Sequence, residues 1–359
     1  MRLFLAAVVL AILLYLGARR VGPVPALGGF LDPANGVWAL ARGAELPARS
    51  AARIPGLTAP VEVLYDDRGV PHVFAATEED AWRAEGYVVA RDRLFQLELQ
   101  TRAAAGTLSE LLGARLLPAD RAARRRGLAW AADRNFAALD SSALIYRAAR
   151  AYADGVNAWM AGMSRAELPL EYRLLGATPR RWEPKHTLYL FSQMAVTLAW
   201  DDETLNRLRV RGLVGGAATE ALFPLNSPIQ EPIQPNGEGA PRYDFVRPLP
   251  PPGAPDTAAE VAAEERERAE LALGLSPRSP ADGDAIGSNN WTVGPRRTAA
   301  GYALLAGDPH LELTLPSIWY EIHLHVAGGT DVVGVTLVGA PGVIIGFNRG
   351  TAWSFTNTG

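Results

Sequence analysis

The chain has 359 residues, of which 48% are hydrophobic and 20% are charged, a balance typical of a globular protein long enough for two domains. The formal net charge is −3 and the basic residues are not gathered in one stripe, so the composition gives no support for nucleic-acid binding. The sequence contains no cysteine, which excludes a disulfide framework, a thiolate metal site and a cysteine nucleophile.

The N-terminus reads as a targeting segment. An apolar run over residues 3–18 lies between Met1-Arg2 and Arg19-Arg20, and it is shorter than the roughly 20 residues of a comfortable membrane span. Residues 1–26 are therefore predicted to be a signal peptide or a short signal anchor, with the folded part periplasmic or secreted. No clean small-x-small cleavage site follows, which leaves cleavage and membrane anchoring open, and a buried N-terminal helix is the alternative.

Residues 27–246 are predicted to be mostly helical, with a β-hairpin near their start. Apolar and polar residues alternate over 61–65, Asp66-Asp67-Arg68-Gly69 supplies a turn, and residues 70–74 resume extended structure.

Two long helices are predicted after this hairpin. Thr77 and Asp80 form a plausible capping box for the first, which contains the charged run Arg91-Asp92-Arg93, interpreted as solvated charges or a structural ion pair. Residues 144–160 form the second, amphipathic helix, in which Gly155 is expected to be tolerated at a cost of about 1 kcal/mol.

The character of the sequence changes over residues 247–287. Proline clusters open and close this segment, and an Ala/Glu/Arg run with little apolar surface fills its middle. It is predicted to be a linker.

Short β-prone runs follow from residue 288 onward. They cover residues 291–293, 302–306, 318–326, 332–337 and 343–347, punctuated by glycine-containing turns, and they predict an antiparallel sheet. The fold class is therefore α+β, a helical half followed by an antiparallel β half. Alternation puts His323 and His325 on one face of a strand, where a metal pair is conceivable, although no third ligand is obvious.

The most informative motif is Gly287-Ser288-Asn289-Asn290-Trp291. If the Gly287–Ser288 bond is broken, Ser288 keeps its hydroxyl and gains an α-amino group, whose reference pKa of about 7.7–8.0 leaves a neutral fraction that can act as a base. Glycine before the serine leaves the attacked carbonyl uncrowded. The alternative is an ordinary polar loop.

Several motifs around Ser288 and upstream of it resemble the penicillin acylase family. The β-chain-like motifs are residues 288–295, 297–298, 304–311 and 315–321. The α-chain-like motifs are residues 69–72, 86–87 with 90–96, 106 with 110–113, 155–158 and 182–184. The resemblance implies a precursor that yields α and β chains, with residues 247–287 as the spacer peptide and residues 288–359 as the start of the β-chain. It also implies the four-layer αββα fold of N-terminal-nucleophile hydrolases.

The resemblance also assigns catalytic roles to individual residues. Ser288 is the nucleophile, the Gly287–Ser288 bond is the autocleavage site, and His310 stands where the family helps to hold the serine. Asn357 is the candidate oxyanion donor, with Thr358 as a near alternative.

The acyl pocket and a metal site follow from the same resemblance. Glu203 matches the region that contributes a calcium ligand, although a solvated acidic turn is an equal reading. The apolar pocket corresponds to Met194, Leu198, Leu311, Ile345 and Phe355.

The expected activity is hydrolysis of a linear small-molecule amide, which releases a carboxylic acid and an amine such as a β-lactam nucleus. N-acyl homoserine lactones are the rival substrate class, and a non-catalytic membrane-anchored fragment is the alternative outside enzymes. The family's β-chain is much longer than residues 288–359, so the chain is expected to be an N-terminal fragment of a precursor.

Overall fold

The structure is a computed structural model that describes residues 1–19, 26, 28–32, 36–38, 41, 49–164, 167–199, 203–223, 287–311 and 313–356. The chain divides into two compact units, one of residues 1–199 with 285–359 and the other of residues 200–284. The predicted linker lies outside the described residues up to residue 286. In the second unit, α11 (Glu203–Val214) and α12 (Gly216–Leu222) are joined by an ion pair between Arg207 and Glu220 at 2.8 Å.

The first unit holds the remaining elements. Before residue 200 they are α1 (Arg2–Gly17), α2 (Gly28–Leu31), β1 (Glu62–Tyr65), β2 (Pro71–Ala75), α4 (Glu78–Ala105), α5 (Leu108–Leu112), η1 (Ala114–Leu116), α6 (Leu117–Arg126), α7 (Leu128–Ala137), α8 (Leu144–Gly162), α9 (Leu170–Leu175) and α10 (Lys185–Ala199). After residue 286 they are β3 (Gly287–Val293), η2 (Pro295–Arg297), β4 (Leu304–His310), β5 (Trp319–Val326), β6 (Asp331–Leu337), β7 (Ile345–Phe347) and β8 (Ala352–Trp353).

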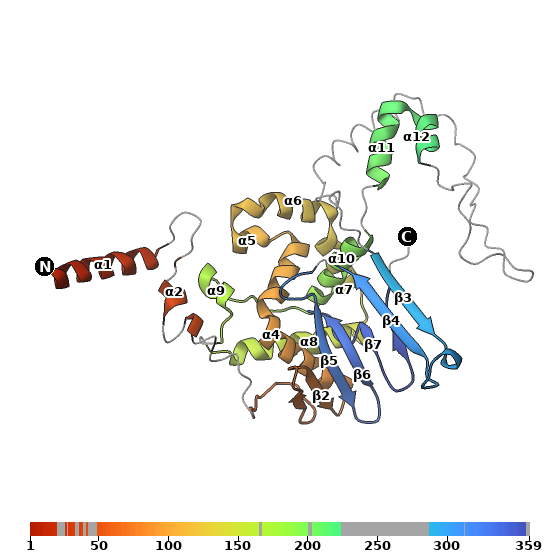
Figure 1. The fold of residues 1–359 in the computed structure, drawn as a ribbon, viewed down its shortest axis with the longest axis horizontal. Helices are drawn as coiled ribbons and strands as arrows, with labels where there is room; N and C mark the ends of the chain where they lie inside the picture. The colour runs from red at the N-terminus through yellow and green to blue at the C-terminus, as the bar shows by residue number, and fades with distance from the viewer. Residues whose placement is uncertain are drawn as a thin grey trace, which may run out of the picture. The chain divides into compact units, whose positions relative to one another are not determined.

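The strands form two sheets (Figure 1). A six-stranded sheet has the order β1-β2-β5-β6-β7-β8, and β3 and β4 form an antiparallel pair. The predicted hairpin at residues 61–74 is confirmed as β1–β2. Among the described strands after residue 286 every pairing is antiparallel, as predicted. The prediction did not include the parallel pairing of β5 with β2, a strand from the first half of the chain. Mixed helix and sheet makes the fold α+β.

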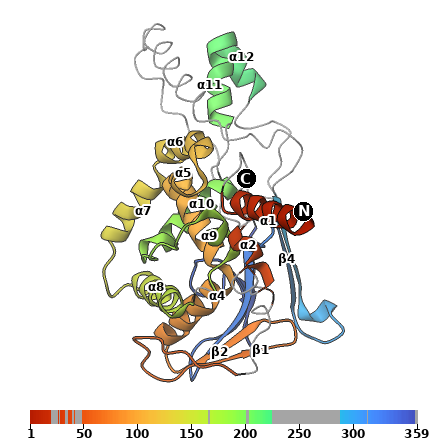
Figure 2. The same ribbon diagram turned by 90° about the vertical axis from the view of Figure 1, so that its left-hand side faces the viewer.

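Helices cover one face of the six-stranded sheet (Figure 2). Alternate residues of β5 are buried, and Ile322 and Leu324 pack in the main core with Val73 of β2 and with Val89 and Leu97 of α4. The alternate apolar residues of β5 and the apolar side of α4 pack against each other at this face. The other face of β5, which includes His323 and His325, is only partly buried.

The start of α4 confirms half of the predicted capping box. The backbone N–H of Asp80 donates to Thr77 Oγ1 at 3.2 Å, which satisfies one of the free amides of the first turn. The Asp80 carboxylate accepts from the backbone N–H of Thr58 at 3.0 Å and pairs with Arg83 at 3.3 Å. The run Arg91-Asp92-Arg93 forms a structural ion pair, with Arg91 Nε 2.9 Å from Asp92 Oδ1.

The apolar N-terminal run forms α1, none of whose residues is buried. Within the described residues, no helix combines the length and the apolar character that a membrane crossing needs.

Two glycines set the contact between α4 and α8. A Cβ at Gly155 would lie 1.9 Å from the Arg83 carbonyl oxygen, and a Cβ at Gly86 would lie 2.2 Å from the Tyr152 carbonyl oxygen. The expectation that Gly155 is merely tolerated is therefore incomplete, because the two helix backbones approach too closely for any side chain there.

We expect Gly155→Ala to destabilise the protein by about 1–3 kcal/mol, because the added methyl group forces α8 away from α4. The matched control is Gly162→Ala at the end of the same helix, where an added Cβ meets nothing within 4 Å. Chemical denaturation of both variants measures the effect. Equal unfolding free energies for the two variants would contradict the close-contact account.

Candidate functional site

Ser288 is the second residue of β3, and the ladder to β4 fixes its position. The register pairs Gly287 with His310, Ser288 with Pro309 and Asn289 with Asp308. A strand held along seven residue pairs orients a side chain better than a loop does. The polar-loop alternative for this motif is therefore replaced by an extended strand.

A polar contact connects this ladder to the end of the six-stranded sheet. Asn290 Nδ2 donates to the Ser354 carbonyl oxygen at 3.2 Å, and a Cβ at Gly307 would lie 1.9 Å from Ser354 Oγ. Ser288 and Asn290 are two residues apart on β3 and so share a face of it. Asn290 Oδ1 and Ser354 Oγ are both buried without a hydrogen-bond partner in the described structure. Of these two atoms, Asn290 Oδ1 belongs to the face of β3 that also holds Ser288.

His310 lies at the end of β4, beside Gly287 rather than beside Ser288. Its Nε2 is 2.9 Å from Asp308 Oδ2, and its side chain is 41% exposed. The carboxylate holds the imidazole in place, and the family role of His310 stays a prediction.

The other predicted residues lie on separate elements. Asn357 and Thr358 lie outside the described residues, as does the side chain of Glu203, which begins α11. The five residues of the predicted acyl pocket are distributed as follows: Met194 and Leu198 are one turn apart on α10, Leu311 follows β4, Ile345 begins β7, and Phe355 follows β8 with 60% of its surface exposed. Their convergence on one pocket stays a prediction.

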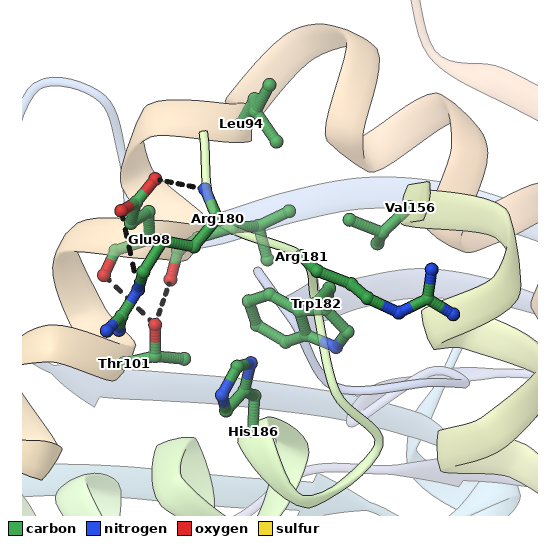
Figure 3. Close-up of a pocket in the computed structure, with 9 residues that line it drawn as sticks. Leu94, Glu98, Thr101, Val156, Arg180, Arg181, Trp182 and His186 are labelled. Atoms are coloured by element: carbon green, nitrogen blue, oxygen red, sulfur yellow. Dashed lines mark hydrogen bonds and ion pairs between the residues drawn. The ribbon is translucent and has the colours of Figure 1, made fainter. Parts of the chain in front are cut away.

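A second polar location lies between α4, α8 and α10, around the buried Glu98 (Figure 3). Its carboxylate pairs with Arg102 Nε at 2.8 Å and accepts from Tyr172 Oη at 2.6 Å and from the Arg180 backbone N–H at 3.2 Å. Burial and the hydrogen bond to Glu98 raise the pKa of Tyr172. Because the described partners of Glu98 lie on α4, on α9 and in the segment before α10, we interpret this cluster as structural.

Two of the family-like motifs meet at the same location. Asn157 Nδ2 donates to the Trp182 carbonyl oxygen at 2.8 Å, and the Trp182 backbone N–H donates to Asn157 Oδ1 at 3.0 Å. The paired bonds fasten the segment before α10 to α8. These motifs therefore support packing rather than chemistry.

Sequence reasoning missed the buried carboxyl group of Glu85 in α4. It accepts from the Gly342 backbone N–H at 2.8 Å, and burial raises its pKa well above the usual value. A glutamate in the apolar run Ala84-Glu85-Gly86 was the only signal in the sequence. This contact ties α4 to the turn between β6 and β7.

The chain matches the family model described as penicillin amidase over residues 60–359. The chain belongs to the penicillin amidase family. It is 38% identical to "Penicillin acylase 2 proenzyme" of Pseudomonas sp. (strain SE83), covering 82% of this chain and 36% of that protein. It is 31% identical to "Acyl-homoserine lactone acylase QuiP" of Pseudomonas aeruginosa (94% and 38%) and 29% identical to "Penicillin G acylase" of Escherichia coli (82% and 38%).

The resemblance to penicillin acylases is thereby confirmed at the level of the family. The chain spans little more than a third of the length of these penicillin amidase relatives. The matched region includes Ser288 and the whole of both sheets.

A buried histidine in this unit makes its stability depend on pH. Burial lowers the pKa of His186 to about 4, and its Nδ1 accepts from the Glu183 backbone N–H at 3.1 Å. Since the unfolded chain has a histidine pKa of about 6.5, it binds the proton more tightly than the folded chain does. The stabilisation that the fold gains from neutral His186 is therefore present above about pH 6.5 and is lost as the pH falls toward about 4.

We expect the unfolding free energy of the parent to fall between pH 7 and pH 4.5 by about 2–3 kcal/mol more than that of His186→Asn, which removes the titrating group. Urea denaturation at the two pH values measures this difference. Parallel losses in both proteins would show that His186 is not the group responsible.

Proposed function

We propose that this chain is part of a self-processing amidohydrolase in which Ser288 becomes an N-terminal nucleophile. The observation that carries the proposal is the position of Ser288, second in a fully paired strand of a penicillin amidase family chain. Substrate hydrolysis then needs neither a catalytic histidine nor a cysteine nucleophile, because the freed α-amino group of Ser288 supplies the base.

Self-cleavage starts from the intact Gly287–Ser288 bond. Ser288 Oγ attacks the Gly287 carbonyl carbon, the C–N bond breaks, and an ester forms between Gly287 and the serine oxygen while the nitrogen becomes a free amine. Water then hydrolyses the ester and leaves the Gly287 carboxylate and the Ser288 hydroxyl. Pairing of Gly287 with His310 and of Ser288 with Pro309 holds both sides of the bond in one extended geometry.

The same serine then acts on the substrate. Its amine takes the hydroxyl proton, the oxygen attacks the amide carbonyl, the amine product leaves with a proton, and water releases the acid from the acyl-enzyme. The developing oxyanion needs preorganised N–H donors, for which Asn357 is our candidate. His310 would position the serine, and the two-chain product would adopt the four-layer αββα fold.

Two substrate classes compete in this proposal. The relatives include a penicillin acylase and an acyl-homoserine lactone acylase, which suggest penicillins and acyl-homoserine lactones as the candidate substrates. Both are small-molecule amides with an apolar acyl group. The predicted acyl pocket is mostly aliphatic, which favours a linear acyl chain over a phenylacetyl group; its residues are Met194, Leu198, Leu311, Ile345 and Phe355. Because acyl-homoserine lactones carry such a linear chain, they are the second candidate beside penicillins.

Three further features belong to the proposal rather than to the described structure. The N-terminal segment would export the protein to the periplasm or beyond, with or without anchoring. Glu203 would contribute to a structural calcium site, since hard oxygen ligands suit that ion. Residues 247–287 would be the spacer that covers the new N-terminus until it is removed.

We expect the purified parent chain to yield a product that begins Ser-Asn-Asn-Trp, and Ser288→Ala to remain uncleaved because it lacks the attacking oxygen. Intact mass and N-terminal sequencing measure both. Ser288→Thr is the matched control, since it keeps a hydroxyl at the same position and should still cleave, more slowly. A parent chain that is folded by circular dichroism and yet stays intact would count against the proposal, as would equal cleavage of Ser288→Ala.

A further inference from the structure

Three strands bring four potential ligands together on the sheet face opposite the helices. β2 and β5 place His72 directly beside His323, and the β5–β6 hairpin places His325 directly opposite Asp331. All four are therefore on the same face of the six-stranded sheet. Each is partly buried, with side-chain exposures between 15% and 37%.

The ligand atoms of three of these residues converge. Asp331 Oδ1 is 2.9 Å from His323 Nε2 and 3.2 Å from His325 Nδ1, and one ligand atom from each residue lies within 4.8 Å of the others. Ligand atoms around a tetrahedral zinc ion lie roughly 3.3 Å apart, so small side-chain rotations suffice to close the set around an ion. Arg349 contacts the other carboxylate oxygen, Oδ2, at 3.4 Å and leaves Oδ1 to the histidines.

The remaining ring nitrogen of His323 is also held. His323 Nδ1 lies 3.0 Å from Nδ1 of His72, and His72 Nε2 is 3.8 Å from Asp66 Oδ2. A metal-binding histidine usually donates its other N–H to a fixed acceptor, which sets the tautomer and the ring orientation. His72 occupies that acceptor position. Such an ordered arrangement is typical of a metal-binding histidine rather than of two surface histidines that happen to be neighbours.

The chemistry of the donors selects the ion. Two imidazoles and one carboxylate suit zinc and its neighbours among the transition metals, whereas calcium prefers an all-oxygen set. Three protein ligands leave coordination positions for water. We propose that His323, His325 and Asp331 bind a zinc-class divalent ion, with His72 as a positioning residue.

The location gives such an ion a structural consequence. His72 comes from the segment before the predicted linker, and the three ligands come from the segment after it. The ion would join β5 to β6, and the contact between His323 and His72 would connect it to the parallel β2–β5 junction at which the two segments meet. This inference does not rest on the proposed acylase activity.

The experiment measures zinc binding to the 359-residue chain in a Ser288→Ala background, which removes any effect of self-cleavage. Competition with a chromophoric chelator should show one tight zinc site in this background. Asp331→Asn and His325→Gln should each weaken zinc binding by about 100-fold or more, and calcium should not compete. His72→Ala should weaken binding by about 10-fold.

His310→Ala is the matched control, because His310 also pairs with an aspartate but lies outside the cluster. It should bind zinc as the Ser288→Ala parent does. Thermal unfolding without metal checks that each variant folds, and zinc should raise the melting temperature of the parent but not of Asp331→Asn. Equal zinc affinity in the parent, Asp331→Asn and His325→Gln would overturn the proposal, as would loss of the tight site in His310→Ala.

Discussion

The parallel pairing of β2 with β5 is the contact on which the rest of the first unit depends. It joins residues 251 positions apart in the sequence and turns two short pieces of β-structure into one six-stranded sheet. Only the combined sheet presents Val73, Ile322 and Leu324 as a continuous apolar face to α4. Without this pairing, the β1–β2 hairpin would be an isolated two-stranded ribbon, which is marginal in water.

The position of Ser288 follows from this sheet through a chain of contacts. β5, β6, β7 and β8 are paired in sequence order, and Ser354 directly after β8 meets Asn290 of β3. The close approach of α8 to α4 and the bond from Gly342 to Glu85 hold the helical layer against the same strands. The candidate nucleophile is therefore placed by packing that begins far from it.

Local patterns in the sequence predicted much of this structure, because they depend on nearby residues. Short β-prone runs between glycine-containing turns located most of the strands after residue 288, and Thr77 marked the start of α4. The parallel pairing could not be predicted, since its partners are distant and their alternation is the same for either strand direction. Gly155 looked like a tolerated glycine because the sequence does not show which helix crosses it.

In the candidate site, too, the features that depend on nearby residues were predicted, and those that depend on distant residues were not. The motif at Ser288 identified the candidate nucleophile, and family resemblance supplied roles that spacing could not. Asp331 was missed as a partner of His323 and His325, although the turn at residues 327–330 between two β-prone runs was a usable signal. A hairpin register that places Asp331 opposite His325 follows only once β5 and β6 have defined ends.

The central claim is that the segments before and after the predicted linker fold as one unit through the β2–β5 junction. The most direct measurement is co-expression of residues 1–246 and 288–359 as separate chains, with an affinity tag on the first only. The account predicts that both chains purify together in equal amounts and unfold in one transition. Purification of the tagged chain alone, in a folded state, would contradict it.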